Sequence, residues 1–171
     1  MNFKEKIRPI RDYPVPGMIY RDITTLLKDP EAYAAMIDSM RDKVGEEPVD
    51  VVVAPEARGF LLGAPLAYLL KAGFVPLRRP GRLPGPVSSI RYLTENGQTD
   101  ELEVHKDAIT PGMRVLIIDD LLATGATALA VCNLVESIGG IIVGVGFSIE
   151  YTHLTGRETL SKYKVHSIIK Y

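Results

Sequence analysis

Cysteine is almost absent from this sequence. Cys132 is the only cysteine in 171 residues. A single cysteine excludes an internal disulfide framework and a metal site built from several thiolates, and it suits a reducing compartment. Long apolar runs are missing too. No stretch approaches the roughly 20 residues that cross a bilayer, and the segment from Met1 to Ile7 contains no signal-peptide core. We therefore expect a cytoplasmic protein that enters no membrane.

The sequence also lacks an excess of either charge. Its 20 Lys and Arg residues nearly cancel its 21 Asp and Glu residues, so no overall field draws the protein to nucleic acid or to an anionic membrane. Any anion must therefore be bound locally. Hydrophobic residues make up 46% and charged residues 24%, which is typical of globular proteins. We expect residues 1–171 to fold as a single domain.

Short apolar runs alternate along the chain with segments of helical periodicity. This alternation favours a parallel sheet covered by helices, with ligands bound beyond the carboxyl ends of the strands. We predict an α/β fold with a central, mainly parallel twisted sheet of about five strands flanked by helices. The predicted strands are 51–54, 74–78, 115–118, 141–147 and 165–169, and the predicted helices are 30–44, 60–71 and 128–138.

The segment 79–103 has a different composition. It contains few apolar residues before Leu102 and Val104. A long segment of this kind inside a compact domain is usually a functional lid or a disordered loop, and we favour a flexible lid. Its turn-forming residues are Pro80, Gly81, Pro84, Gly85, Pro86 and Gly97.

Two acidic residues and a small-residue loop connect the third predicted strand to the third predicted helix. The strand ends at Asp119 and Asp120, and the loop runs from Ala123 to Thr127. Free N–H groups at a helix N-terminus bind phosphate, and Gly125 lets the backbone come close to it. The two acids are suited to accept hydrogen bonds from a sugar diol. The alternative is that Thr124 only caps the helix and that both acids are solvated.

The string 115–127 resembles the phosphoribosyl pyrophosphate signature of type I phosphoribosyltransferases, and most closely that of the members that use adenine. The resemblance implies a single domain with a small N-terminal hood for the base at residues 1–28 and a lid at residues 79–103. It also implies a homodimer. Four further segments resemble the family in the same order, so the likeness covers almost the whole chain: 16–23, 56–60, 74–84 and 102–109.

The implied reaction joins adenine to the ribose 5-phosphate of phosphoribosyl pyrophosphate and releases AMP and pyrophosphate, as in purine salvage. It passes through an oxocarbenium-like transition state, which nearby carboxylates stabilise. Two alternatives stay open: a transferase for hypoxanthine or guanine, and a non-catalytic sensor of phosphoribosyl pyrophosphate. Sensors of this kind usually carry a DNA-binding segment, and the beginning of this chain is too short and too little basic to be one.

The resemblance also implies roles for single residues. The loop would hold the 5-phosphate, the two acids the ribose hydroxyls, and the arginines the pyrophosphate. Mg²⁺ would be held mainly by substrate and water, with no direct protein ligand. The alternatives are a surface salt bridge for Arg58 and a solvated loop for Arg79 and Arg82. The implied residues for phosphoribosyl pyrophosphate are Ala57, Arg58, Arg79, Arg82, Asp119, Asp120, Ala123, Thr124, Gly125, Ala126 and Thr127.

For the base, the resemblance places Ile19, Tyr20 and Arg21 against the purine, with the Tyr20 ring as a stacking face. Tyr151 stands over the purine, where the family more often has an aliphatic residue. Glu95 matches a lid glutamate that is implicated in proton transfer at the purine. Tyr20 could instead be a core residue, and Glu95 a solvent-facing one. The implied catalytic residues are Arg58, Glu95, Asp119 and Asp120.

Besides Tyr151, the chain departs from the family pattern at four places. The lid segment 86–91 is unlike the usual one, and Asn96 stands where a Tyr commonly follows the glutamate. Gln98 is an insertion in the same lid. Ala126 replaces the second glycine of the phosphate loop, and we expect its methyl group to be tolerated if its φ is negative.

Overall fold

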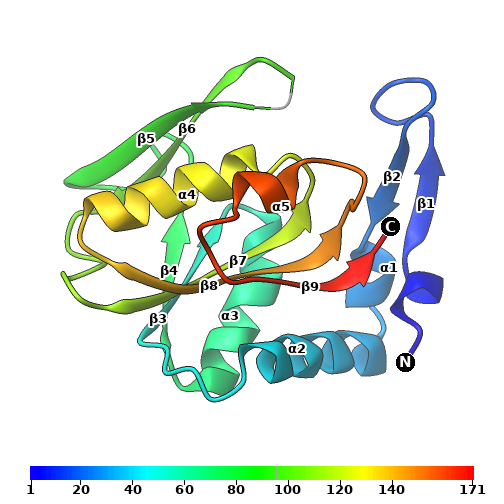
Figure 1. The fold of residues 1–171 in the computed structure, drawn as a ribbon, viewed down its shortest axis with the longest axis horizontal. Helices are drawn as coiled ribbons and strands as arrows, with labels where there is room; N and C mark the ends of the chain where they lie inside the picture. The colour runs from blue at the N-terminus through cyan, green and yellow to red at the C-terminus, as the bar shows by residue number, and fades with distance from the viewer. Residues whose placement is uncertain (95) are drawn as a thin grey trace.

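The computed structural model describes residues 1–94 and 96–171, and Figure 1 shows its elements. None of the helices in these two ranges has both the length and the apolar character that crossing a bilayer requires. The helices are η1 (Phe3–Lys6, a 3-10 helix), α1 (Thr24–Leu27), α2 (Pro30–Val44), α3 (Arg58–Leu70), α4 (Ala126–Ser137) and α5 (Gly156–Thr159). The strands are β1 (Arg8–Arg11), β2 (Ile19–Asp22), β3 (Val51–Pro55), β4 (Gly73–Leu77), β5 (Val87–Leu93), β6 (Thr99–His105), β7 (Arg114–Leu122), β8 (Ile141–Glu150) and β9 (Val165–Lys170).

Five parallel strands form the central sheet in the order β4-β3-β7-β8-β9. The predicted α/β class and the predicted number of strands are therefore confirmed. The carboxyl ends of parallel strands meet at one edge, which is where ligands bind in such sheets. β7 is longer than predicted, because it runs through Asp119 and Asp120 to Leu122 and pairs with β8 as far as Glu150.

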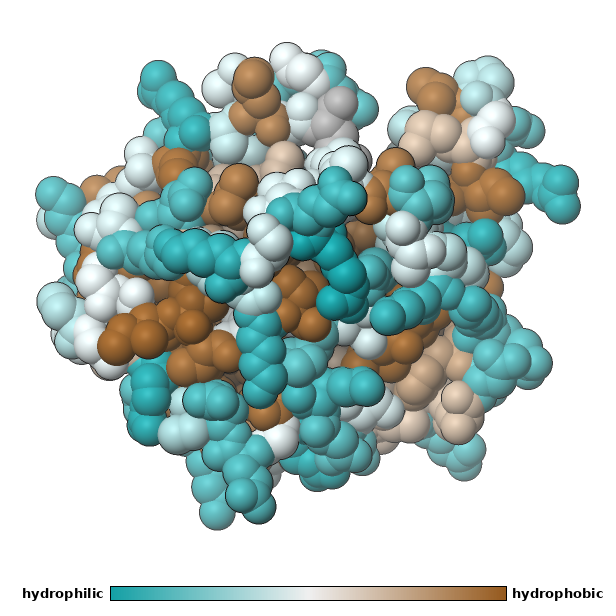
Figure 2. All heavy atoms as spheres, in the orientation of Figure 1, coloured by the Kyte–Doolittle hydropathy of each residue, from teal (hydrophilic) through white to brown (hydrophobic). Residues whose placement is uncertain are grey.

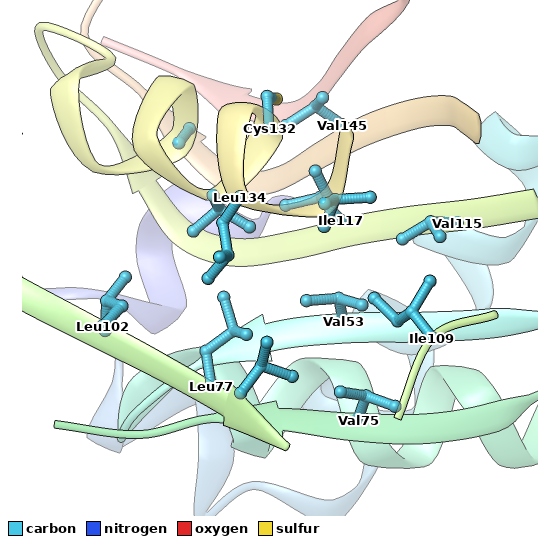
Figure 3. Packing of buried hydrophobic residues seen from close by; sticks show 14 of the residues in the cluster. Val53, Val75, Leu77, Leu102, Ile109, Val115, Ile117, Cys132, Leu134 and Val145 are labelled. Atoms are coloured by element: carbon cyan, nitrogen blue, oxygen red, sulfur yellow. The ribbon is translucent and has the colours of Figure 1, made fainter. Parts of the chain in front are cut away.

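The sheet separates two hydrophobic cores, because successive side chains of a strand point to opposite faces. Val51 and Val53 pack on the face that α4 covers, whereas Val52 packs on the face that α2 and α3 cover. Figure 3 shows Cys132 and Leu134 of α4 beside the side chains of the strands. Burial raises the pKa of the Cys132 thiol to about 12. The helices on both faces hold the strand ends in place at the edge where ligands bind.

Two antiparallel ribbons stand outside the central sheet. β1 pairs with β2 in the segment predicted as the hood, and β5 pairs with β6 in the segment predicted as the lid. Figure 1 shows the tips of the two ribbons on the same side of the molecule. In the space-filling view a notch separates them (Figure 2).

The segment 79–103 is more regular than its composition suggests. Residues 87–93 and 99–105 form a regular hairpin, with Val87 opposite His105 and Leu93 opposite Thr99. The prolines and glycines lie before this hairpin or at its tip, so they leave the strand pairing intact. The hairpin is held because apolar side chains of both its strands pack against the core that α4 covers: Ile90, Tyr92, Leu102 and Val104.

Candidate active site

Two adjoining polar cavities lie at the carboxyl ends of β3 and β7. Their volumes are about 230 and 200 Å³. Arg58, Asp119, Asp120 and Thr127 line both cavities. The fold therefore brings together the residues predicted for pyrophosphate, ribose and 5-phosphate, although α3 and the β7–α4 loop are far apart in the sequence.

The predicted phosphate loop leads from β7 into α4. Ala123, Gly125, Ala126 and Thr127 line the larger polar cavity. The φ angle of Gly125 is 84°, a left-handed value that favours glycine. Ala126 is the first residue of α4 and is not among the described residues with positive φ, so its methyl group is tolerated as expected. The N–H of Ala126 donates to Oγ1 of Thr124 at a long 3.5 Å. Like the N–H groups of the following residues, it has no acceptor within the helix and can turn to an anion.

The phosphate loop rests on α5, a contact that sequence reasoning missed. A Cβ atom at Gly125 would lie 3.1 Å from the carbonyl oxygen of Gly156 and 3.1 Å from Cβ of Thr159. The Thr159 hydroxyl donates to the carbonyl of Thr124 at 2.8 Å. A Cβ atom at Gly156 would in turn lie 2.5 Å from the carbonyl oxygen of Ala123. Tertiary packing therefore requires a glycine at position 125, in addition to the predicted close approach of a phosphate.

Asp119 and Asp120 form an acidic pair beside one cation. The Nε atom of Arg58 lies 2.8 Å from Oδ2 of Asp120, and the N–H of Asp120 donates to Oδ1 of Asp119 at 2.8 Å. Burial raises the pKa of both carboxyl groups, and the charge of Asp120 raises the pKa of Asp119 further. Arg58 opposes the rise at Asp120. Asp120 is therefore the more acidic of the two carboxyl groups.

Arg58 also connects the polar cavities to the hood. Its Nη1 atom donates to the hydroxyl of Tyr20 at 2.6 Å, and its Cζ atom lies 5.8 Å from the centre of the Tyr20 ring. The alternative interpretation of Arg58 was a surface salt bridge. Arg58 does form a salt bridge, but with Asp120 in the lining of the polar cavities. Tyr20 is partly exposed and is not a core residue.

Of the other residues predicted for pyrophosphate, two line a polar cavity and one does not. Ala57 and Arg79 line the smaller polar cavity beside Arg58. Arg82 is exposed and lines neither polar cavity. The structure thus brings Arg58 and Arg79 together and leaves Arg82 outside.

A third and mostly apolar cavity of about 600 Å³ adjoins the polar ones. It shares Leu121 and Ala123 with the larger polar cavity. The four residues predicted for the base all line it: Ile19, Tyr20, Arg21 and Tyr151.

Sequence reasoning missed other aromatic residues of this cavity. The ring of Tyr13 meets that of Tyr20 edge-on, with 5.4 Å between ring centres. The ring centre of Tyr171 lies 6.5 Å from that of Tyr151 and 4.1 Å from the Cζ atom of Arg21. No local motif marks Tyr13 or Tyr171, because only the pairing of the hood and of β9 with their neighbours brings them to the cavity.

The structure does not test the predicted role of Glu95 or the predicted Mg²⁺. Glu95, predicted as catalytic, lies outside the described residues. In the part of the chain that the structure describes, no group of three His, Cys, Asp or Glu side chains is close enough together to hold a metal ion.

Comparison with known proteins agrees with the family resemblance of the sequence. A phosphoribosyl transferase domain model matches residues 22–170. The adenine phosphoribosyltransferase of Alkaliphilus metalliredigens is 53% identical over 171 residues, which cover 100% of both chains. The crystal structure of adenine phosphoribosyltransferase from Thermoanaerobacter pseudethanolicus has a TM-score of 0.95 at 49% identity, over 99% of this chain and 98% of that one. The enzyme from Saccharomyces cerevisiae, complexed with an iminoaltritol bisphosphate and adenine, has a TM-score of 0.88 at 34% identity, over 95% and 94%.

The fold, the phosphate loop and the domain match together define the class: this chain belongs to the phosphoribosyltransferase family. Within that family, the similar proteins just described are adenine phosphoribosyltransferases, and the chain matches them over nearly its full length.

Proposed function

We propose that the protein transfers the phosphoribosyl group of phosphoribosyl pyrophosphate to adenine and releases AMP and pyrophosphate, as in purine salvage. The observation that carries this proposal is the junction of a polar cavity with an aromatic one at Leu121 and Ala123. A sugar phosphate bound on the polar side would present its anomeric carbon to a planar base on the aromatic side. The names of the full-length relatives support adenine as that base.

The polar side has the groups that the reaction needs. Free N–H groups at the start of α4 bind the 5-phosphate together with the loop 123–127. Asp119 and Asp120 accept hydrogen bonds from the ribose hydroxyls, and the ionised Asp120 stabilises the positive charge that develops on the ring as the bond to pyrophosphate breaks. Arg58 and Arg79, beside the backbone of Ala57, bind the departing pyrophosphate.

Mg²⁺ fits this site as an ion that arrives with the substrate. Magnesium prefers oxygen ligands, keeps several waters and binds through substrate phosphates with few protein contacts. Asp119 and Asp120 line the polar cavities and can hold waters of such an ion. When bound, the ion neutralises charge on the pyrophosphate.

On the aromatic side, Tyr20 and Tyr151 offer ring faces to the purine, and the backbone of 19–21 can read its edge. The lid closes over the site and excludes water, which would hydrolyse the activated sugar. We assign proton transfer at the purine to Glu95 by its likeness to the family's lid glutamate.

We also propose a cytoplasmic homodimer. α3 exposes three large apolar side chains, Leu61, Tyr68 and Leu69, and 83% of Tyr68 is accessible. Exposed apolar groups gathered on one helix are typical of a surface that a partner covers. A second copy of the chain is the partner that the family resemblance implies.

The test is Mg²⁺-dependent nucleotide formation from phosphoribosyl pyrophosphate with adenine, hypoxanthine, guanine or xanthine. Selective formation of AMP would support the proposal. A preference for a 6-oxo purine by about tenfold or more in kcat/KM would overturn the choice of adenine. Tight binding of phosphoribosyl pyrophosphate without product from any base would indicate a sensor.

A further inference from the structure

One lid side chain reaches the phosphate loop. The hydroxyl oxygen of Tyr92, on β5, lies 3.3 Å from Oγ1 of Thr127 on α4. The Tyr92 ring packs against the hydrophobic core beside α4 together with Ile90, and burial raises the pKa of its phenol. The ring therefore fixes where the hydroxyl lies, and Thr127 is its hydrogen-bond partner there.

The same hydroxyl lies in the polar site. Tyr92 lines the smaller polar cavity with Arg58, Arg79 and Asp119, and Thr127 lines both polar cavities. Tyr92 thus contacts the phosphate loop from the side of the lid, whereas α5 supports the loop from the other side of Gly125. Its position links the lid to the part of the site that is built for an anion.

We propose that Tyr92 is a positioning residue for the 5-phosphate of phosphoribosyl pyrophosphate, acting through Thr127; this inference rests on the proposed function. A hydroxyl has one proton to donate and two lone pairs to accept with. In the structure Oγ1 of Thr127 donates to the Tyr92 hydroxyl. When a phosphate oxygen accepts the single Thr127 proton instead, the Tyr92 phenol can turn its own proton toward Oγ1 of Thr127. Chained hydrogen bonds of this kind polarise one another, so each strengthens the next.

The arrangement also links lid position to substrate. The hydrogen bond between Thr127 and Tyr92 ties the lid to the loop. A phosphate that accepts from Thr127 strengthens the bond that Tyr92 then donates to Thr127. Binding of the 5-phosphate therefore favours the lid position seen in the structure.

The test is Tyr92→Phe, which keeps the ring and its packing and removes only the hydroxyl. KM for phosphoribosyl pyrophosphate should rise about tenfold, because a hydrogen bond that supports a charged group is lost, with KM for adenine and kcat changed less than about twofold. Calorimetric titration with ribose 5-phosphate should show the same loss of affinity without any turnover. Leu93→Ala is the matched control, since Leu93 is the next residue on the opposite face of β5 and is 65% exposed.

A double variant distinguishes loss of the Tyr92–Thr127 hydrogen bond from a general disturbance of the lid. In a Thr127→Val background, Tyr92→Phe should cause no further loss of ribose 5-phosphate affinity, because the relay is already broken. Additive losses, or equal affinity of the wild type and Tyr92→Phe, would overturn the role of Tyr92. No AMP formation by the wild type would instead overturn the proposed function, while the tenfold affinity loss would still support the link between Tyr92 and Thr127.

Discussion

Arg58 and Asp120 form an ion pair at the meeting point of the two polar cavities, with 2.8 Å between Nε and Oδ2. Asp120 is 7% exposed, whereas about half of the Arg58 side chain is accessible. In the proposed reaction the pair would place a cation for pyrophosphate beside an anion for the ribose, and the charge of Arg58 lowers the pKa of Asp120 against the effect of burial. Pyrophosphate that binds Arg58 competes with Asp120 for the same guanidinium, which would release the Asp120 carboxylate toward the sugar.

Asp120→Asn should lower kcat by at least about a hundredfold, because the negative charge near the developing cation is lost. The fold should remain, since Asn has nearly the same volume and Arg58 can turn to water. Steady-state kinetics and thermal unfolding of the same sample measure both effects. Wild-type turnover in this variant would refute the role of Asp120.

Asp119→Asn should stabilise the protein at neutral pH while it lowers activity. The folded-state pKa of Asp119 is raised well above 3.8 by burial and by Asp120, so the wild type loses stability as the pH rises from about 3.8 through that folded value. Asn carries no charge and still offers an oxygen to the N–H of Asp120. A gain of about 1 kcal/mol would raise Tm by roughly 2–4 °C at pH 7.

The pH dependence provides the check on this interpretation. The Tm difference between wild type and Asp119→Asn should disappear well below pH 3.8, where the carboxyl is protonated in both states. Asp107→Asn, at an exposed position, is the control for a change of net charge. A Tm for Asp119→Asn below that of the wild type at pH 7 would contradict the assignment of a costly buried charge.

Gly125→Ala should destabilise the protein and weaken phosphate binding. The left-handed φ of 84° strains any side chain, and the new Cβ would lie 3.1 Å from the backbone of Gly156. We expect a loss of about 2 kcal/mol or more in the free energy of unfolding and a higher KM for phosphoribosyl pyrophosphate. Gly112→Ala is the control, because Gly112 has a φ of 89° but no atom within 4 Å of its added Cβ. Equal losses in both variants would show that the contact with α5 contributes nothing.

Glu150→Gln should destabilise the chain next to the base cavity. Glu150 is 3% exposed, accepts two hydrogen bonds from Arg157 at 2.6 and 2.8 Å, and also bonds to Ser167. The Arg157 side chain is 44% exposed, so the loss should be about 1.5–3 kcal/mol, as for hydrogen bonds to a charged group, and less than for a fully buried pair. KM for adenine should rise because Tyr151 follows directly. Urea unfolding measures the loss.

The pH dependence of the Glu150 effect has the opposite sign from that of Asp119. Arg157 lowers the pKa of Glu150 from 4.5, so the stabilisation is present above pH 4.5 and is lost as the pH falls through the lowered folded value. The urea curves of wild type and Glu150→Gln should therefore converge at low pH. Glu158→Gln, at an exposed position on α5, should unfold like the wild type throughout, and a persistent gap for Glu150→Gln in acid would point to packing instead of charge.

The lid illustrates where local signals are misleading. Its prolines and glycines are typical of a flexible lid or a disordered loop and predicted no strands, yet 87–93 and 99–105 pair as a hairpin. Ile90 and Tyr92 alternate with exposed residues along β5, but that alternation becomes meaningful only when α4 is present to receive those side chains. Composition therefore predicted a segment apart from the main sheet, and packing decided its conformation.

The sequence by itself determined the five core strands, the helices between them and the loop 123–127 with its preceding acids, because each depends on residues that are neighbours in the chain. Only the tertiary structure decided which side chains meet. Tyr20 and Arg58 are 38 positions apart, and Tyr92 and Thr127 are 35 apart, so no local pattern records their contact. The order of strands in the sheet brings such residues to one edge, and that order is set by how the helices cover both faces.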